Sequence, residues 1–303
     1  MSVSTTDQGF DLVTELLGKT PFDKPNKVAV YCGDRKVTYG ELNANINRFA
    51  NLLKDMGIQP QDRVLIVAPD TPEFMYTFLG SMKHGAWPVP VNTMLKDEDY
   101  AYLLKDSDAK LIVTTTTSPA ATVAAGFPSL KKLFVDQGYD DMLKSASSEP
   151  RQFIKGPDEI AFWLYSSGST GKPKGTPHRQ KAMLHTADCY SKDVLSIVPE
   201  DVCFSVSKMF FAYGMGNSIS FPLRAGASTV LLSSAPTPEL VIETINKFRP
   251  SIFFGVPTQY NSLLKKMEGQ KFDSIRLCAS AGEALPPEVF NKWFEKTGLQ
   301  ILD

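Results

Sequence analysis

The chain has 303 residues, of which 43% are hydrophobic, so it is long enough for one large domain or two ordinary ones with a substantial core. Its 32 basic and 33 acidic residues give a formal net charge of −1, and no basic excess points to nucleic acid or to an acidic membrane surface. Residues 1–20 lack the apolar segment of a signal peptide, and no apolar run reaches the ~20 residues of a membrane span, so we expect a soluble cytoplasmic protein.

The first half of the chain alternates short apolar strands with amphipathic helices. The sequence Thr-Tyr-Gly-Glu at residues 38–41 is a capping box, and it begins a helix that Gly57 ends. Pro88 and Pro90 predict that the strand at 87–91 is short or irregular. The other expected elements are an amphipathic segment at 12–17, a hairpin at 28–38, strands at 64–68, 111–115 and 132–136, and helices at 72–83, 97–105 and 120–125.

The second half continues the same alternation. Apolar strands that alternate with helices predict an α/β fold of doubly wound, mostly parallel sheets with flanking helices. Residues 137–157 are rich in Gly, Ser and Pro and are the best candidate for a linking segment, so we expect one α/β subdomain at 1–150 and a second at 151–303. The expected elements are strands at 160–164, 202–207, 228–232, 251–255, 275–280 and 299–302, and helices at 179–194, 215–223, 238–248, 258–267 and 287–296.

The stretch from 165 to 175 gathers three glycines, four Ser or Thr side chains and two lysines after the strand at 160–164. Glycines let backbone N–H groups approach oxygens, hydroxyls add donors, and lysines supply charge-assisted bonds to phosphate. The spacing differs from that of the common P-loop, and a solvated surface turn is the alternative interpretation. We call residues 166–175 the phosphate loop and expect ATP phosphates to contact Ser166, Ser167, Gly168, Ser169, Thr170, Gly171, Lys172, Lys174 and Gly175.

Residues 165–175 resemble the phosphate loop of the adenylate-forming enzymes, which include acyl-CoA synthetases, the adenylation domains of peptide synthetases and luciferases. We call residues 210–217, Phe-Phe-Ala-Tyr-Gly-Met-Gly-Asn, the aromatic segment. It is most similar to benzoate–CoA ligases and their hydroxybenzoate relatives, and many other members carry His where this chain has Tyr213. On local evidence alone, ordinary core packing explains such an aromatic run as well.

The resemblance implies a set of pocket residues at the ends of predicted strands, where parallel sheets place their ligands. Residues 279–286 would run along the adenine ring, and small residues there would let the backbone approach a flat base. The adenine-binding residues implied are Ala281, Gly282 and Glu283. The acyl-pocket residues implied are Phe211, Ala212, Tyr213, Gly214 and Gly255.

Neither the histidines nor the cysteines point to catalysis. We interpret His84, His178 and His185 as structural, since a lone histidine is more often a structural donor than a base, and the Gly-x-Ser-x-Gly motif of a nucleophile elbow is absent. The four cysteines show no metal-type spacing and are expected to be small buried hydrophobes in a reducing compartment: Cys32, Cys189, Cys203 and Cys278. No side chain is assigned as a metal ligand.

The resemblance implies an ATP-dependent carboxylate–CoA ligase that uses ATP, Mg²⁺ and coenzyme A on benzoate or a related small aromatic acid, as in aromatic acid degradation. The carboxylate would attack the α-phosphorus of ATP, and coenzyme A thiolate would then attack the acyl-adenylate. The family continues past Asp303 into a further phosphate- and magnesium-binding stretch and a C-terminal lid domain, so we expect 1–303 to be a truncated N-terminal portion that is inactive alone.

Two alternatives from other classes stay open at this point. The chain could be a non-catalytic nucleotide- or acyl-binding module. An NAD-dependent dehydrogenase fits the alternating fold, but Ile219 stands where the third glycine of the dinucleotide fingerprint is needed. The sequence does not predict an oligomeric state, and it does not choose among the small aromatic acids.

Overall fold

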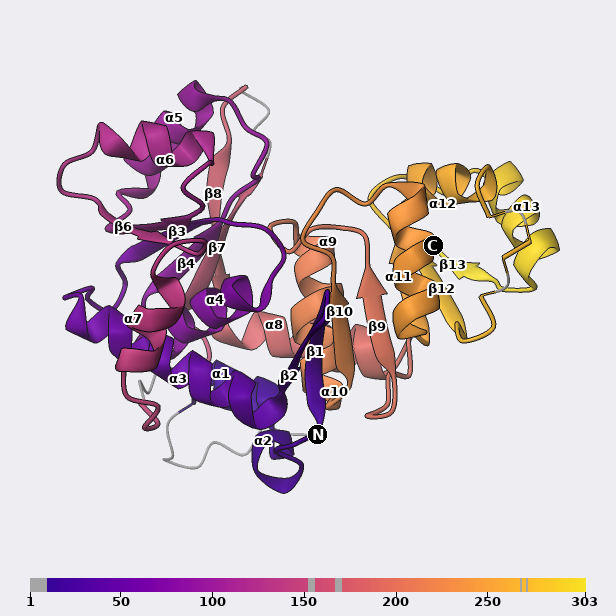
Figure 1. Cartoon of the computed structure of the whole chain (residues 1–303), viewed down its shortest axis with the longest axis horizontal. Coiled ribbons are helices and arrows are strands. Elements are labelled where there is room, and N and C mark those ends of the chain that lie inside the picture. The colour runs from indigo at the N-terminus through magenta and orange to yellow at the C-terminus, as the bar shows by residue number, and fades with distance from the viewer. Residues whose placement is uncertain (1–9, 152–155, 167–170, 268, 271) are drawn as a thin grey trace. The chain divides into compact units, whose positions relative to one another are not determined.

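The computed structural model describes residues 10–151, 156–166, 171–267, 269–270 and 272–303. Their contacts group them into two compact units (Figure 1). Unit 1 comprises the described residues of Met1–Asp23, Gly40–Pro69 and Glu73–His185. Unit 2 comprises Lys24–Tyr39, Asp70–Pro72 and the described residues of Thr186–Asp303.

Unit 1 contains a four-stranded parallel sheet in the order β4-β3-β5-β6 and a two-stranded antiparallel sheet, β7-β8. Its elements are α1 (Leu12–Leu17), α2 (Thr20–Asp23), α3 (Tyr39–Asp55), β3 (Arg63–Val67), α4 (Pro72–His84), β4 (Trp87–Pro90), α5 (Asp97–Ser107), β5 (Leu111–Thr114), α6 (Pro119–Ala125), β6 (Lys131–Phe134), α7 (Tyr139–Ser145), β7 (Ile160–Ser166), β8 (Lys174–Arg179) and α8 (Gln180–Thr186). Strand β4 lies at the edge of its sheet, the position that tolerates its two prolines because an edge strand need not donate on both sides.

Helices cover both faces of the parallel sheet of unit 1, since its strands are apolar on both sides. Helices α5 and α6 pack on one face through buried residues such as Tyr100 and Ala120, against Leu65 and Ile112 of the strands (Figure 1). Helices α3, α4 and α7 lie on the other side (Figure 1). This arrangement confirms the doubly wound pattern that the alternation predicts.

Unit 2 is built on a seven-stranded sheet in the order β13-β12-β11-β9-β10-β1-β2, in which the described pairs are parallel except β1–β2. One face packs against α11, α12 and α13, and the other against η1 and α10, so this sheet is also covered on both sides. Its elements are β1 (Val28–Cys32), β2 (Arg35–Thr38), η1 (Ala187–Lys192), β9 (Val202–Ser205), α9 (Ala212–Met215), η2 (Gly216–Ser220), α10 (Phe221–Ala225), β10 (Ser228–Leu231), α11 (Pro238–Phe248), β11 (Ile252–Gly255), α12 (Pro257–Leu264), β12 (Leu277–Ser280), α13 (Pro287–Thr297) and β13 (Ile301–Leu302).

The structure differs from the sequence predictions at four places. Strand β8 is not among the predicted elements, because its mostly exposed residues carry no apolar alternation, and the helix expected from 179 begins one residue later as α8. Helix α7 forms within the expected linker, where Tyr139 and Leu143 are buried. The helix expected at 215–223 is a succession of short α9, π-helical η2 and α10. The units also group the chain differently from a single division at residue 150, because the β1–β2 hairpin joins unit 2 while β7 and β8 join unit 1.

Candidate functional site

The described part of the phosphate loop belongs to unit 1 and starts and ends at paired strand positions. Strands β7 and β8 are antiparallel, with Tyr165 opposite Gly175 and Ser166 opposite Lys174. The loop is therefore the connection of a hairpin, which fixes the separation of its two ends. Four of the expected phosphate ligands, Ser167, Gly168, Ser169 and Thr170, lie outside the described residues.

The second arm of the phosphate loop presents both lysines to solvent. Lys172 and Lys174 are exposed, and among the described residues neither forms an ion pair. Gly171 has φ of +89°, a conformation that L side chains rarely adopt, and no atom lies within 4 Å of where a Cβ would be. Packing explains the glycine at position 175, since a Cβ there would lie 3.1 Å from the Trp163 ring. An open turn with two available ammonium groups suits an anionic ligand.

Helix α5 fixes both arms of the phosphate loop. The Tyr102 hydroxyl donates to the Pro173 carbonyl at 3.0 Å, and the Lys172 ammonium lies 5.3 Å from the centre of the Tyr102 ring. On the first arm, the Tyr165 hydroxyl donates to Asp106 Oδ2 at 2.7 Å. Burial, followed by the hydrogen bond to Asp106, raises the pKa of Tyr165, so this hydroxyl keeps its proton and remains a donor. Sequence reasoning missed Tyr102 and Asp106, because only the fold brings α5 to the loop.

The expected pocket residues of unit 2 follow the carboxyl ends of neighbouring parallel strands. Gly255 of β11 is the register partner of Ser280, which ends β12. Phe254 of β11 pairs in turn with Ser205, which ends β9. The Tyr213 ring packs edge-on against Phe254, with 6.4 Å between centroids and 87° between planes. The structure thus brings the aromatic segment, Gly255 and the start of the 281–283 stretch to the carboxyl ends of neighbouring strands of this sheet.

The aromatic segment is partly a core element and partly accessible. Phe210 is buried, whereas 50% of Phe211 is exposed, and the two rings lie 4.6 Å apart. Ala212 is exposed and Tyr213 is half-buried, and burial raises the pKa of the Tyr213 phenol. Steric exclusion explains the glycine at position 214, since a Cβ there would lie 2.1 Å from the Lys208 carbonyl oxygen. Exposed Phe211 and Ala212 are available to a flat apolar ligand.

The expected adenine-binding residues form an open turn after β12. Gly282 and Glu283 are exposed and Ala281 is half-buried. Gly282 has φ of +93°, and no atom lies within 4 Å of the place that a Cβ would take, so its backbone face is free for close approach. Gly255 is different, because its Cβ would lie 2.6 Å from the Tyr260 ring, which gives this glycine a packing role whether or not it lines a pocket.

Two residues behind the aromatic segment were missed by sequence reasoning. Asp70 is 4% exposed and accepts a hydrogen bond from the Met209 backbone N–H at 3.2 Å. Lys208 Nζ lies 4.0 Å from Asp70 Oδ2 and donates to the carbonyls of Leu232 and Ser234 at 2.5 Å and 2.7 Å. The only sequence signal was the position of Lys208 next to the aromatic segment, and nothing local pointed to Asp70.

The histidines and cysteines mostly follow the structural interpretation. His84 is buried with Nε2 2.8 Å from the Ile58 carbonyl, and His178 stacks on Phe162 at 4.7 Å. Burial lowers the pKa of both imidazoles. Cys203 and Cys278 are buried and Cys32 is half-buried, but the prediction is wrong for Cys189, which is exposed on the π-helical turn η1. None of the four cysteines forms a disulfide.

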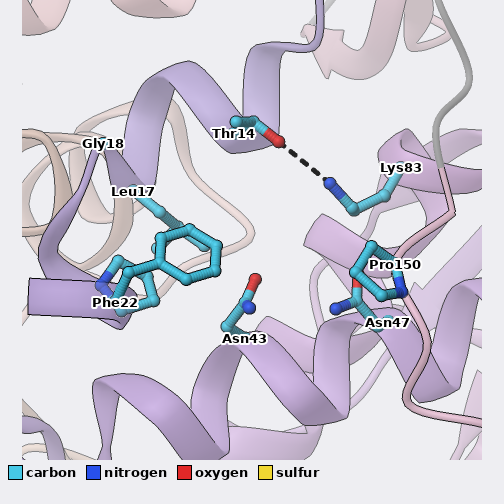
Figure 2. Close-up of a pocket in the computed structure, with 9 residues that line it drawn as sticks. Thr14, Leu17, Gly18, Phe22, Asn43, Asn47, Lys83 and Pro150 are labelled. Carbon is cyan, nitrogen blue, oxygen red and sulfur yellow. Dashed lines mark hydrogen bonds between the residues drawn. The ribbon is translucent and has the colours of Figure 1, made fainter. Parts of the chain in front are cut away.

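A separate cavity of about 260 Å³ in unit 1 is lined by none of the expected site residues. Figure 2 shows Lys83 reaching toward Thr14 across its rim, at 3.0 Å between Nζ and Oγ1. Lys83 also forms an ion pair with Asp11 at 2.7 Å, and because Asp11 caps α1 this pair attaches α1 to α4. The lining residues are Thr14, Leu17, Gly18, Pro21, Phe22, Asn43, Asn47, Lys83 and Pro150.

Two absences among the described residues bear on the kind of site. No group of three or more His, Cys, Asp or Glu among them could hold a metal ion. None of the helices among them is both long enough and apolar enough to cross a membrane.

Comparison with known proteins gives consistent results. The family model described as AMP-binding enzyme matches residues 19–303. The chain is 40% identical over 305 aligned positions to the benzoate–CoA ligase of Thauera aromatica, covering 97% of this chain and 58% of that protein. Crystal structures of a benzoate CoA ligase from Burkholderia xenovorans LB400 match with a TM-score of 0.91 at 34% identity, covering 96% of this chain and 60% of that one.

A third match is the crystal structure of the anthranilate CoA ligase AuaEII in complex with anthranoyl-AMP, with a TM-score of 0.94 and 31% identity over 99% of this chain and 60% of that one. The chain therefore spans about three-fifths of the relatives that it matches, and the fold that the alternating elements predict is confirmed. Because the family model covers nearly the whole sequence, the chain belongs to the family of AMP-binding enzymes.

Proposed function

We propose that the protein carrying this chain forms the coenzyme A thioester of benzoate or a related small aromatic acid, with ATP as the activating substrate and an acyl-adenylate as the intermediate. The observation that carries the proposal is the 40% identity with a benzoate–CoA ligase along 97% of this chain. The accessible aromatic segment beside the β11 strand end supports a flat, apolar acid.

In this proposal the phosphate loop holds the β- and γ-phosphates of ATP, which leave together as pyrophosphate. The first step places a carboxylate against a polyanion, so positioning and charge neutralisation carry most of the catalysis. Lys172 and Lys174 are exposed and can supply positive charge, and the backbone around Gly171 is open for oxygens to approach. The α5 contacts reduce the entropy that the loop loses when phosphate binds.

The strand ends of unit 2 would hold the acid and the adenine. Phe211, Ala212 and Tyr213 form the wall against the aromatic ring of the acid, and the open turn at Gly282 gives the adenine a close backbone surface. Tyr213 stays protonated, because burial raises the pKa of its phenol, so it can donate a hydrogen bond but adds no charge that would repel a carboxylate.

Mg²⁺ belongs to the proposal as the counter-ion of ATP and would supply charge neutralisation of the phosphates. The described residues offer no carboxylate or imidazole cluster for it, so no side chain of this chain is assigned to it. Coenzyme A is the acceptor substrate in the second step. A cytoplasmic location also belongs to the proposal, supported by four cysteines that form no disulfide.

The test is acid-dependent ATP–pyrophosphate exchange, measured with benzoate, the hydroxybenzoates, anthranilate and a short aliphatic acid. The assay uses a form of the protein as long as its relatives, with residues 1–303 alone as a second sample. We expect exchange with an aromatic acid and thioester formation when coenzyme A is added. Binding of ATP and benzoate by calorimetry in the long form, without exchange, would instead support a non-catalytic binding module.

A further inference from the structure

The base of the aromatic segment is held by a buried carboxylate that comes from a distant part of the chain. Asp70 is 4% exposed and lies 139 positions away from Met209, whose backbone N–H donates to it at 3.2 Å. A buried carboxylate that accepts a backbone N–H fixes that peptide group strongly, because an unpaired charge or donor in the interior is costly.

Lys208 ties the same point to a second strand end. Its ammonium lies 4.0 Å from Asp70 Oδ2 and donates to the carbonyls of Leu232 and Ser234, which follow β10. The Lys208 carbonyl in turn accepts from the Phe211 N–H at 3.0 Å. Side chain and backbone of one residue therefore connect Asp70, the β10 end and the aromatic segment.

The steric fit of Gly214 shows that this loop is tightly closed. A Cβ on Gly214 would lie 2.4 Å from the Ser207 carbonyl oxygen and 2.1 Å from that of Lys208, so the aromatic segment turns back onto its own first residues. A loop closed this tightly transmits a shift at Met209 directly to Phe211 and Tyr213, because packed interiors move as units.

We propose that Asp70 is a positioning residue for the aromatic segment: by holding the Met209 N–H and facing Lys208 it sets where Phe211 and Tyr213 stand, and thereby the affinity for the aromatic acid. The part that concerns affinity rests on the proposed function. The part that concerns the position of the segment rests on the contacts alone.

The charge on Asp70 should make this positioning sensitive to pH. Burial raises the pKa of Asp70 to about 6, against the opposing effects of Lys208 and of the Met209 N–H. Cys32 also faces this pair, with Sγ 4.0 Å from the Asp70 carbonyl oxygen, and its charge would raise the pKa of Lys208, which burial lowers. The affinity for the aromatic acid should therefore fall, and its KM rise, as the pH falls through about 6 and Asp70 takes up a proton.

The test compares Asp70→Asn with Asp34→Asn, a matched loss of charge at a carboxylate of unit 2 whose side chain is 98% exposed. Asn at 70 keeps an oxygen for the Met209 N–H but removes the charge opposite Lys208. We expect Asp70→Asn to raise the KM for the aromatic acid about tenfold with little change in the KM for ATP, since a hydrogen bond to a charged group is replaced by a neutral one. Asp34→Asn should change neither constant.

Hydrogen exchange of the peptides covering 207–217 gives a readout that does not depend on activity. We expect faster exchange there in Asp70→Asn, no change in Asp34→Asn, and a Tm within about 4 °C of wild type for both. The dependence of the acid KM on pH between 5.5 and 7.5 should flatten in Asp70→Asn.

The results separate the two levels of the proposal. If no aromatic acid supports ATP–pyrophosphate exchange in the wild type, the proposed function fails. Hydrogen exchange alone then decides whether Asp70 holds the aromatic segment. If hydrogen exchange at 207–217 is unchanged in Asp70→Asn, the inference is overturned. Faster hydrogen exchange there, together with equal rises in the KM for the aromatic acid and the KM for ATP, also overturns it. The effect of the substitution would then be general rather than specific to binding of the aromatic acid.

Discussion

The hydroxyl of Tyr102 donates to the carbonyl of Pro173 at 3.0 Å, and this bond attaches helix α5 to the second arm of the phosphate loop. Pro173 lies between Lys172 and Lys174 in the chain, so the bond positions the backbone from which both lysine side chains extend. The second arm of the loop is therefore held in place by α5 before a ligand arrives, which lowers the entropy cost of binding.

Tyr102→Phe should therefore weaken the use of ATP. The substitution keeps the ring beside the Lys172 ammonium and removes only the hydroxyl, so we expect the KM for ATP to rise about threefold to tenfold, the value of one neutral hydrogen bond. The KM for the acid should stay the same. Steady-state kinetics check this, with Tyr31→Phe, a half-buried tyrosine of unit 2, as the control. An unchanged KM for ATP would show that the α5 contact does not position the second arm of the loop for ATP.

Lys174→Ala should weaken the adenylation step, because it removes an exposed ammonium at the position paired with Ser166. A charge-assisted bond to phosphate is worth about 1.5–3 kcal/mol, so we expect exchange to fall about 10- to 100-fold. Cys189→Ala is the control, since this exposed thiol lies on η1 in the other unit. Equal activity of the two variants would remove the assignment of the phosphate loop.

Gly255→Ala should lower stability before it affects binding. Its Cβ would lie 2.6 Å from the Tyr260 ring, and the fully buried Tyr260 donates to the Ala279 carbonyl at 2.8 Å. Such overpacking costs about 1–3 kcal/mol, which thermal unfolding measures as a lower Tm. Gly156→Ala is the control, because the nearest atom to its Cβ would be 3.7 Å away. An unchanged Tm with a raised KM for the acid would instead assign Gly255 to the pocket alone.

Asp201→Asn should destabilise unit 2 in a manner that depends on pH. Asp201 is 4% exposed, and its carboxylate accepts from Arg276 Nη2 at 2.6 Å, the Ser251 hydroxyl at 2.7 Å and the Val198 N–H at 2.9 Å. Burial alone raises the pKa of Asp201, but these hydrogen bonds, led by that from Arg276, outweigh it and hold the pKa below its ordinary value. Asp201 is buried but the Arg276 side chain is 41% exposed, so we expect a cost of about 1.5–3 kcal/mol, the range for hydrogen bonds to a charged group.

The sign of the pH dependence follows from the lowered pKa. The stabilisation by Asp201 is complete above the ordinary pKa of 3.8 and disappears as the pH falls through the lower value of the folded protein. The difference in unfolding free energy between wild type and Asp201→Asn should thus be largest at pH 7 and narrow below pH 3.8 in denaturant titrations. Asp273→Asn, from an exposed pair with Arg249, should show almost no difference at either pH.

Most elements of the fold could be predicted from local patterns. The strands at β3, β5 and β11 are short apolar runs, and the helices at α3 and α11 repeat apolar residues at helical spacing, so sequence alone located them. Strand β8 could not be found this way, because its residues are mostly exposed and its pairing with β7 replaces any apolar signal of its own.

The sequence by itself determined the α/β alternation and indicated the phosphate loop and the aromatic segment as candidate sites, because glycine, lysine and aromatic residues in close spacing carry their chemistry locally. Only the tertiary structure decided what fixes those segments. Asp70 reaches Met209, and Tyr102 reaches Pro173, across 139 and 71 positions of the chain. Contacts at such separations depend on which strands and helices become neighbours, and that is a property of the packed sheets rather than of any local stretch.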